Sequence, residues 1–169
     1  ANSPKIHQCW RKSRIAARIL LRKNGLVPDC SGEGAAFAQG GECIKALPDQ
    51  KSWQEYGRPD LRDVGNDLRL PVPLKLQSGG DNIEALSILQ TALGVSAAKP
   101  TRIIKTPVDL VVVRSEFLPH LVEKRGQYRE AYANYIIPTL ENPYEVWLTA
   151  YEDGFRKRYI GLFQDQRDL

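Results

Sequence analysis

The sequence predicts an α+β fold, in which a small, mostly antiparallel sheet of about four strands carries helices on one side and follows a basic helical arm. The first observation is the order of segments along the 169 residues, with helical patterns, two strand-like runs, two more helical patterns and two final strand-like runs. The second is Asp153-Gly154, a two-residue hairpin signal between the last two runs. Strands joined by such a turn pair antiparallel, so both observations favour the same class.

The first segment is strongly basic and predicts a helix over residues 6–24. Its arginines recur every three or four residues, along one helix face: Arg11, Arg14, Arg18 and Arg22. Seven of the 24 basic residues lie in the first 28 positions, where no Asp or Glu occurs, and the rest of the chain has 17 basic and 20 acidic residues. The positive charge therefore belongs to an arm, residues 1–48, and not to the domain predicted at residues 49–169.

The arginine stripe leaves two interpretations open. An uninterrupted basic face favours contacts with phosphate groups or with an acidic partner, and in that case Arg11, Arg14 and Arg18 are candidate substrate contacts. The second interpretation is the solvated face of an ordinary amphipathic helix.

The three cysteines, Cys9, Cys30 and Cys43, also allow several states. With His7 they make a possible set of four zinc ligands, although their spacing matches no standard zinc finger. They can equally be buried free thiols, or one disulfide with a spare thiol. No metal or cofactor is therefore assigned to the chain.

The middle of the chain connects the arm to the domain. The glycine-rich residues 29–41 predict a loop, residues 49–56 a short helix, and the proline-rich stretch up to residue 73 turns and extended chain. The sequence SGEG lacks the Gly-Lys-Ser/Thr ending of a phosphate-binding loop. No run of about 18 apolar residues occurs, so the sequence predicts no membrane-spanning helix.

The domain contains the clearest helix, for which Asp81 is the predicted N-cap, Glu84 the third residue of a capping box and Gly94 the end. Two β-branched runs, residues 101–105 and 108–113, predict strands. Two further helices are predicted before the hairpin: residues 115–123, and residues 127–137 ending near Pro138.

The final hairpin comprises predicted strands at residues 144–151 and 155–163. Side chains alternate between the two faces of a strand, so Arg158 and Tyr159 are expected on opposite faces. The six residues that follow predict a polar tail.

Candidate chemistry is concentrated around the last helices and the last strand. His120 can accept and return a proton near neutral pH. The guanidinium groups of Arg125 and Arg129 match phosphate oxygens and stabilise the negative charge that develops in phosphoryl transfer. Lys124 is a further candidate cation nearby. Three tyrosines at helical spacing have rings that are able to stack on bases: Tyr128, Tyr132 and Tyr135. The last strand adds a cation, Arg158, and a phenol, Tyr159.

A purely structural interpretation of the same residues stays open. Tyrosines at helical spacing commonly pack in a core with their hydroxyl groups in water. On this interpretation the charged residues of the same stretch form only a solvated face: Glu123, Arg125, Arg129 and Glu130.

Several phrases between residues 53 and 163, roughly two-thirds of the chain, carry a family resemblance. They are GRPDLRDV, DNIEALSILQTALGV, TPVDLVVV, LPHLVEKR, REAYANYIIPTLENPYEVWLTAYEDG and KRYIGLF. The chain resembles the toxin-like C-terminal domains of MuF-type phage head-morphogenesis proteins. That group is classed in the superfamily of barnase, EndoU, the colicin nucleases and RelE.

The resemblance implies a four-stranded antiparallel sheet with helices on one side and a nuclease that cleaves RNA without a metal, by attack of the 2′-hydroxyl group on the adjacent phosphate. His120 would then be base or acid, Arg125 and Arg129 would bind the phosphate, and Lys124 and Tyr159 would assist. Thr139 and Tyr132 would donate or accept hydrogen bonds with the substrate.

We expect a nuclease toxin domain, with RNA or else DNA as its substrate, that is delivered with a phage or a secreted carrier and acts in the bacterial cytoplasm. Expected protein partners are an immunity protein and a phage head or carrier protein, with no membrane partner. The alternative is a non-catalytic virion or packaging module that binds DNA or a capsid protein through its basic surface.

Overall fold

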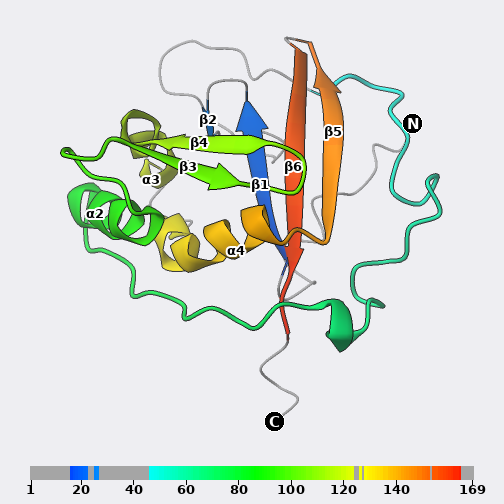
Figure 1. Ribbon diagram of the computed structural model, residues 1–169, viewed down its shortest axis with the longest axis horizontal. Helices are drawn as coiled ribbons and strands as arrows, with labels where there is room; N and C mark the ends of the chain where they lie inside the picture. Colours follow the sequence, from blue (N-terminus) through cyan, green and yellow to red (C-terminus); the bar gives the residue numbers. More distant parts are fainter. Residues whose placement is uncertain are drawn as a thin grey trace.

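The computed structural model describes residues 16–22, 25–26, 46–123, 126, 128–152 and 154–164. This part of the chain forms two antiparallel sheets and several short helices, which confirms the predicted α+β class. The larger sheet has the strand order β2-β1-β6-β5, and the smaller sheet is the β3–β4 hairpin (Figure 1). The strands are Ala16–Arg22 (β1), Gly25–Leu26 (β2), Thr101–Lys105 (β3), Leu110–Arg114 (β4), Glu145–Tyr151 (β5) and Gly154–Leu162 (β6).

Residues 16–22 have a different secondary structure from the one predicted. Residues 16–22 form strand β1, which pairs antiparallel with β6 from Ala16 opposite Leu162 to Leu21 opposite Lys157. The helix predicted over residues 6–24 is therefore wrong for this stretch. A central place in a sheet outweighs the weak helix propensity of a short segment.

Strand β1 also bears on the predicted basic arm. Arg18 lies in the sheet opposite Ile160, whereas Arg11 and Arg14 lie outside the described residues. The division of the chain into residues 1–48 and 49–169 stays a prediction, although β1 shares a sheet with β6.

Helix α2 (Asn82–Leu93) has the predicted ends. The Asp81 carboxylate accepts a hydrogen bond from the Glu84 backbone N–H at 2.8 Å, and Gly94 ends the helix in the left-handed conformation with φ 65°. The Glu84 carboxylate accepts from the N–H of Gly80 at 2.6 Å, one residue before the N-cap that a capping box would use.

The remaining helices are short and partly of the 3-10 type. They are Asn66–Leu68 (η2), Ser115–Phe117 (η3), Pro119–Val122 (α3), Arg129–Tyr135 (η5) and Ile136–Glu141 (α4). Pro138 does not end a helix as predicted, because it lies in the first turn of α4, where a missing N–H costs no intrahelical bond. The helix predicted at residues 49–56 is also absent, since this segment forms turns.

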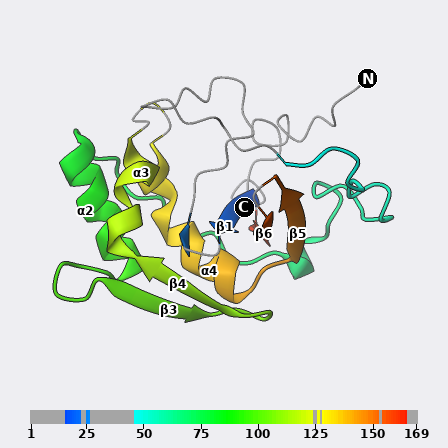
Figure 2. The same cartoon turned by 90° about the horizontal axis from the view of Figure 1, so that it is seen from above.

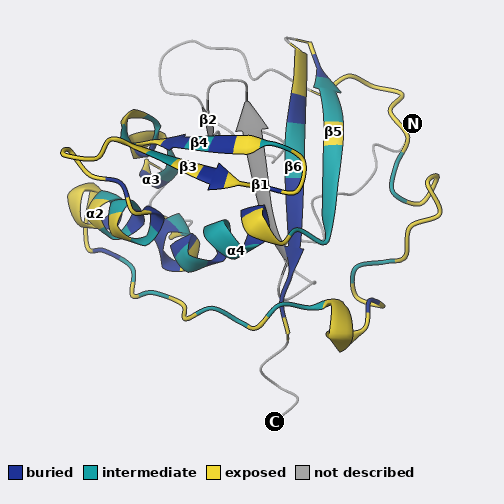
Figure 3. Cartoon of the chain, viewed as in Figure 1, coloured by how far each residue is buried: buried dark blue, intermediate teal, exposed yellow. Residues whose placement is uncertain are grey.

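The main core lies between the helices, the β3–β4 hairpin and one face of the larger sheet (Figures 1 and 2). Its buried members include Leu89, Leu93, Val113, Leu140 and Tyr159. Strand β6 contributes Tyr159 to this core. As Figure 3 shows, the strand is buried over most of its length. Helices thus cover one side of the sheet, as predicted.

A second, smaller cluster lies on the opposite face of β6. It joins Val64 of the irregular segment 46–70 to Ile160 and Leu162. The same segment follows the sheet through isolated bridges between Ala46 and Tyr151 and between Leu70 and Phe163. Among the described residues, the helices are all too short or too polar to cross a bilayer.

Candidate active site

A histidine–carboxylate pair lies on helix α3 and at its C-cap. His120 Nδ1 lies 2.8 Å from Glu123 Oε1, and the two side chains are 62% and 56% exposed. When a carboxylate accepts a hydrogen bond from Nδ1–H, the other nitrogen of a neutral imidazole, Nε2, is unprotonated. In that tautomer Nε2 of His120 can accept a proton, which is what a general base requires.

The cations predicted to act with His120 are only partly described. Lys124 and Arg125 lie outside the described residues. Arg129 begins η5, which packs against α2 and α3. The structure thus places Arg129 on an element that contacts the helix of His120.

The predicted tyrosine stripe separates into accessible and buried rings. Tyr132 is 42% exposed, and Lys75 Nζ lies 4.8 Å from the centre of its ring. Tyr135 is buried, with its ring centre 4.9 Å from that of Phe163. Tyr132 is hence available for a ligand, whereas Tyr135 belongs to the core.

Tyr159 lies in a different place from His120. Its hydroxyl group is buried and donates a hydrogen bond to Asp109 Oδ1 at 2.6 Å, and it lies 3.2 Å from Thr106 Oγ1. Lys157 Nζ donates to the other carboxylate oxygen of Asp109. Helix α3 lies next to α2, away from β6, in both views (Figures 1 and 2). The structure therefore does not bring Tyr159 together with His120 as the sequence predicted.

The ionisation of this cluster suits a structural anchor. Burial and the hydrogen bond to Asp109 raise the pKa of Tyr159 to about 12, so its phenol stays protonated. Burial alone would raise the pKa of Asp109, but hydrogen bonds from Lys157, Tyr159 and Thr106 outweigh it and the pKa is lowered. Asp109 is thus a carboxylate that ties the turn between β3 and β4 to strand β6.

Arg158 lies on the opposite face of β6 from Tyr159. Its Nη2 donates a hydrogen bond to the Tyr151 hydroxyl at 2.6 Å, and the guanidinium group of Arg156 lies 3.8 Å from the centre of the Tyr151 ring. The predicted alternation of this strand is confirmed. Since the sheet separates them, Arg158 and Tyr159 cannot contact the same group of a substrate.

Residues 88–169 match a nuclease family model. Its description is phage-Barnase-EndoU-ColicinE5/D-RelE like nuclease2. No curated protein and no solved structure matches the chain. The match supports the superfamily expected from the sequence, a toxin-type nuclease function and a nucleic acid as substrate. The matched stretch contains His120, Glu123, Arg129 and the Asp109 cluster.

Thr139, a predicted substrate contact, is fully buried on α4. It packs against Gly161, where an added Cβ atom would lie 2.6 Å from Thr139 Oγ1. This hydroxyl group has no hydrogen-bond partner within the described part of the chain. Its position does not support a contact with substrate.

We therefore expect Thr139→Val to leave nuclease activity unchanged and to raise the free energy of unfolding by up to about 1 kcal/mol, because an unpaired buried hydroxyl is unfavourable. Urea denaturation and an RNA cleavage assay measure the two effects. Thr106→Val is the control, since the Thr106 hydroxyl has partners in Asp109 and Tyr159 and its loss should destabilise. Loss of activity in a folded Thr139→Val variant would show that Thr139 does reach the substrate.

Sequence reasoning missed several of these residues. The structural interpretation places Glu123 on a solvated face, although its position three residues after His120 on a predicted helix is a signal for a pair. Glu130 was placed on the same face but is 1% exposed, so that interpretation is wrong for Glu130. Asp109 and Lys157 are far apart in the sequence, and no local pattern links them.

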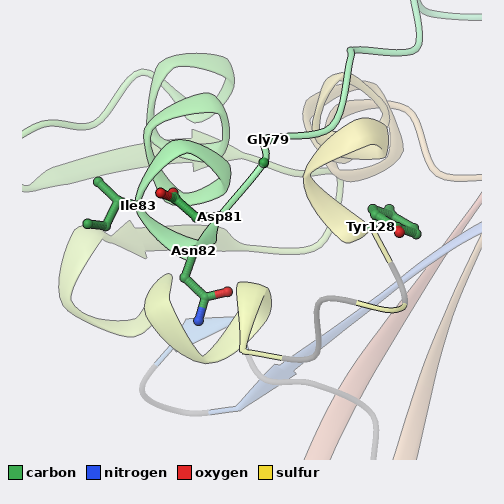
Figure 4. A pocket seen from close by; sticks show the side chains of 6 residues that line it. Gly79, Asp81, Asn82, Ile83 and Tyr128 are labelled. Atoms are coloured by element: carbon green, nitrogen blue, oxygen red, sulfur yellow. The ribbon is translucent and has the colours of Figure 1, made fainter.

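An open hollow lies at the N-terminal end of α2 (Figure 4). It is lined by Gly79, Gly80, Asp81, Asn82, Ile83 and Tyr128. Asp81 uses its carboxylate to cap α2, and among the described residues predicted to be catalytic, neither His120 nor Arg129 nor Tyr159 lines the hollow. We do not assign the active site to it.

Metal ligands do not gather within the described ranges, where no group of three or more His, Cys, Asp or Glu side chains is positioned to hold an ion. The possible zinc set, His7 with the three cysteines, lies outside these ranges.

Proposed function

We propose that the chain carries a metal-independent ribonuclease toxin domain. The family match over residues 88–169 supports a nuclease. The observation that carries the choice of mechanism is the contact between His120 Nδ1 and Glu123, because a neutral ring that donates its Nδ1 proton to Glu123 has Nε2 as the proton acceptor.

In this mechanism His120 Nε2 takes the proton of a ribose 2′-hydroxyl group, and the 2′-oxygen attacks the adjacent phosphorus atom. The bond from phosphorus to the 5′-oxygen breaks, and that oxygen takes a proton from water as it leaves. The protonated His120 then returns its proton to the hydroxide ion so formed, which restores the neutral base. The products are a 2′,3′-cyclic phosphate and a 5′-hydroxyl group. Arg129, with Lys124 and Arg125 from the sequence, would stabilise the charge of the pentavalent state.

We further propose that the domain acts in the bacterial cytoplasm after delivery with a phage or secreted carrier of the MuF type, and that an immunity protein neutralises it in the producing cell. The matched family is a phage nuclease family, which motivates delivery by a phage as the first setting to test. RNA is preferred over DNA because the mechanism needs a 2′-hydroxyl nucleophile.

The test is incubation of the full chain with one RNA and with the DNA of the same sequence, both single-stranded, in EDTA. We expect RNA fragments that end in 2′,3′-cyclic phosphate, with the DNA intact. Cleavage that stops in EDTA would contradict the proposal. Intact RNA and DNA that nevertheless shift in a gel would favour the non-catalytic packaging module.

A further inference from the structure

Lys75 lies over the exposed ring of Tyr132 because its two neighbours in the chain, Leu74 and Leu76, are hydrogen-bonded to η5. The Leu76 N–H donates to the Ala131 carbonyl at 2.9 Å, and Asn134 Nδ2 donates to the Leu74 carbonyl at 2.8 Å. These bonds fix residues 74–76 along η5. The ammonium group of Lys75 consequently lies 4.8 Å from the centre of the Tyr132 ring.

The cation in this arrangement is available to a ligand. Lys75 and Tyr132 are both exposed, and Lys75 makes no ion pair with a described carboxylate. An ammonium group has three N–H donors, and a contact with the face of a ring leaves them able to bind an anion. Glu130, the acidic residue nearest in sequence to Tyr132, is buried.

Tyr132 also lies in line with a residue of the candidate active site. In a 3-10 helix residues i and i+3 eclipse each other, so Arg129 and Tyr132 form one row along η5. This helix packs against α3, which carries His120. Helix η5 therefore joins the element that carries His120 to the Lys75–Tyr132 contact.

We propose that Lys75 and Tyr132 form a subsite for single-stranded RNA outside the reacting phosphate, in which Lys75 binds a backbone phosphate and the Tyr132 ring stacks on a base. This inference rests on the proposed function for the identity of the ligand. Cations on a groove and exposed rings are the two features by which proteins bind single strands without reading sequence. The subsite adds affinity for the substrate and does not take part in bond cleavage.

The test measures binding of the full chain to a 2′-O-methyl RNA of about 12 nucleotides, a length typical of single-strand sites. This RNA lacks the 2′-hydroxyl nucleophile, so binding is measured apart from cleavage. We expect Lys75→Gln to weaken binding by about three- to tenfold and to lower the slope of log K against log salt by about 0.7, the value for one phosphate contact on a single strand. Tyr132→Leu should weaken binding by about fivefold or more with the slope unchanged.

Lys51→Gln is the matched control, because Lys51 Nζ also lies near an exposed ring, 5.8 Å from the centre of Tyr56, on a distant segment. It should change the affinity by less than about twofold if the effect is specific to the subsite. Binding by Lys75→Gln equal to wild type, or an equal loss in Lys51→Gln, overturns the subsite. In cleavable RNA, Lys75→Gln should raise KM with kcat unchanged.

The two proposals can fail separately. If the wild-type chain binds the 2′-O-methyl RNA through Lys75 and Tyr132 but cleaves no RNA, the ribonuclease fails and the subsite stands. If it cleaves RNA and both variants bind and cleave as the wild type does, the subsite fails and the ribonuclease stands.

Discussion

His120→Ala is expected to lower kcat/KM for RNA cleavage by about 10²- to 10⁴-fold, the usual contribution of a general base. The reason is that His120 is the one histidine among the described residues. When its Nδ1–H donates to Glu123, Nε2 of the neutral ring is the proton acceptor. Affinity for the 2′-O-methyl RNA should change little, since the side chain is exposed and its removal leaves the fold intact. Single-turnover cleavage and equilibrium binding measure the two quantities.

Glu123→Gln separates orientation from proton transfer. It keeps a hydrogen-bond acceptor but removes the charge, so we expect a loss of about tenfold or less in kcat. Nitrogen NMR of the imidazole gives an independent measurement, because the chain has only two histidines and the signals of His120 are missing in His120→Ala. In the wild type the proton should be found on Nδ1, and in Glu123→Ala this preference should fall. Full cleavage by His120→Ala would falsify the assignment of the base.

Asp109→Ala is expected to lower the free energy of unfolding by about 2–3 kcal/mol. Its carboxylate accepts hydrogen bonds from Thr106, Lys157 and the buried Tyr159, and the variant leaves the Tyr159 hydroxyl without this acceptor. The bonds connect the β3–β4 turn to β6, so the variant should also loosen the β3–β4 hairpin. Urea denaturation measures the loss, and hydrogen exchange of the β3 and β4 amides measures the loosening.

Asp60→Ala is the matched control for this prediction. Asp60 forms an ion pair with Arg62, which lowers its pKa to about 2, but the pair lies at the surface and is local in sequence. Removal of Asp60 should therefore cost less than about 1 kcal/mol. An equal loss of unfolding free energy in Asp60→Ala and Asp109→Ala would show that the hydrogen bond to the buried Tyr159 adds nothing to the stabilisation by Asp109.

The pH dependence of the Asp109 contribution has a defined sign. The pKa of Asp109 in the folded state is lowered, so the carboxylate stabilises the fold above its unfolded pKa of about 3.9. As the pH falls from about 4 through the folded pKa, this stabilisation is lost. The difference in unfolding free energy between wild type and Asp109→Ala should accordingly be constant near neutral pH and shrink below about pH 4. A difference that persists unchanged in acid contradicts the role of the charge.

Local patterns account for what could be predicted of the fold. The cap at Asp81 and the end at Gly94 depend on side-chain and backbone preferences within one helix, and both were predicted. The last hairpin and the opposite faces of Arg158 and Tyr159 follow from strand alternation and were also predicted. The candidate base His120 was found by residue type, and its partner lies only three residues away.

Contacts between distant segments decided the rest. Residues 16–22 have a helical pattern but form β1, because pairing with β6, far along the chain, satisfies their backbone and places them in the sheet. Tyr159 becomes a buried anchor because the turn that carries Asp109 folds over it, and Lys75 meets Tyr132 because residues 74–76 bind along η5. The sequence by itself determined the fold class, the ends of α2, the faces of the final hairpin and the candidate base, since each depends on neighbours within a few residues. Only the tertiary structure decided which of the remaining polar groups are buried, which are accessible and which meet, because these depend on packing between segments that no local period connects.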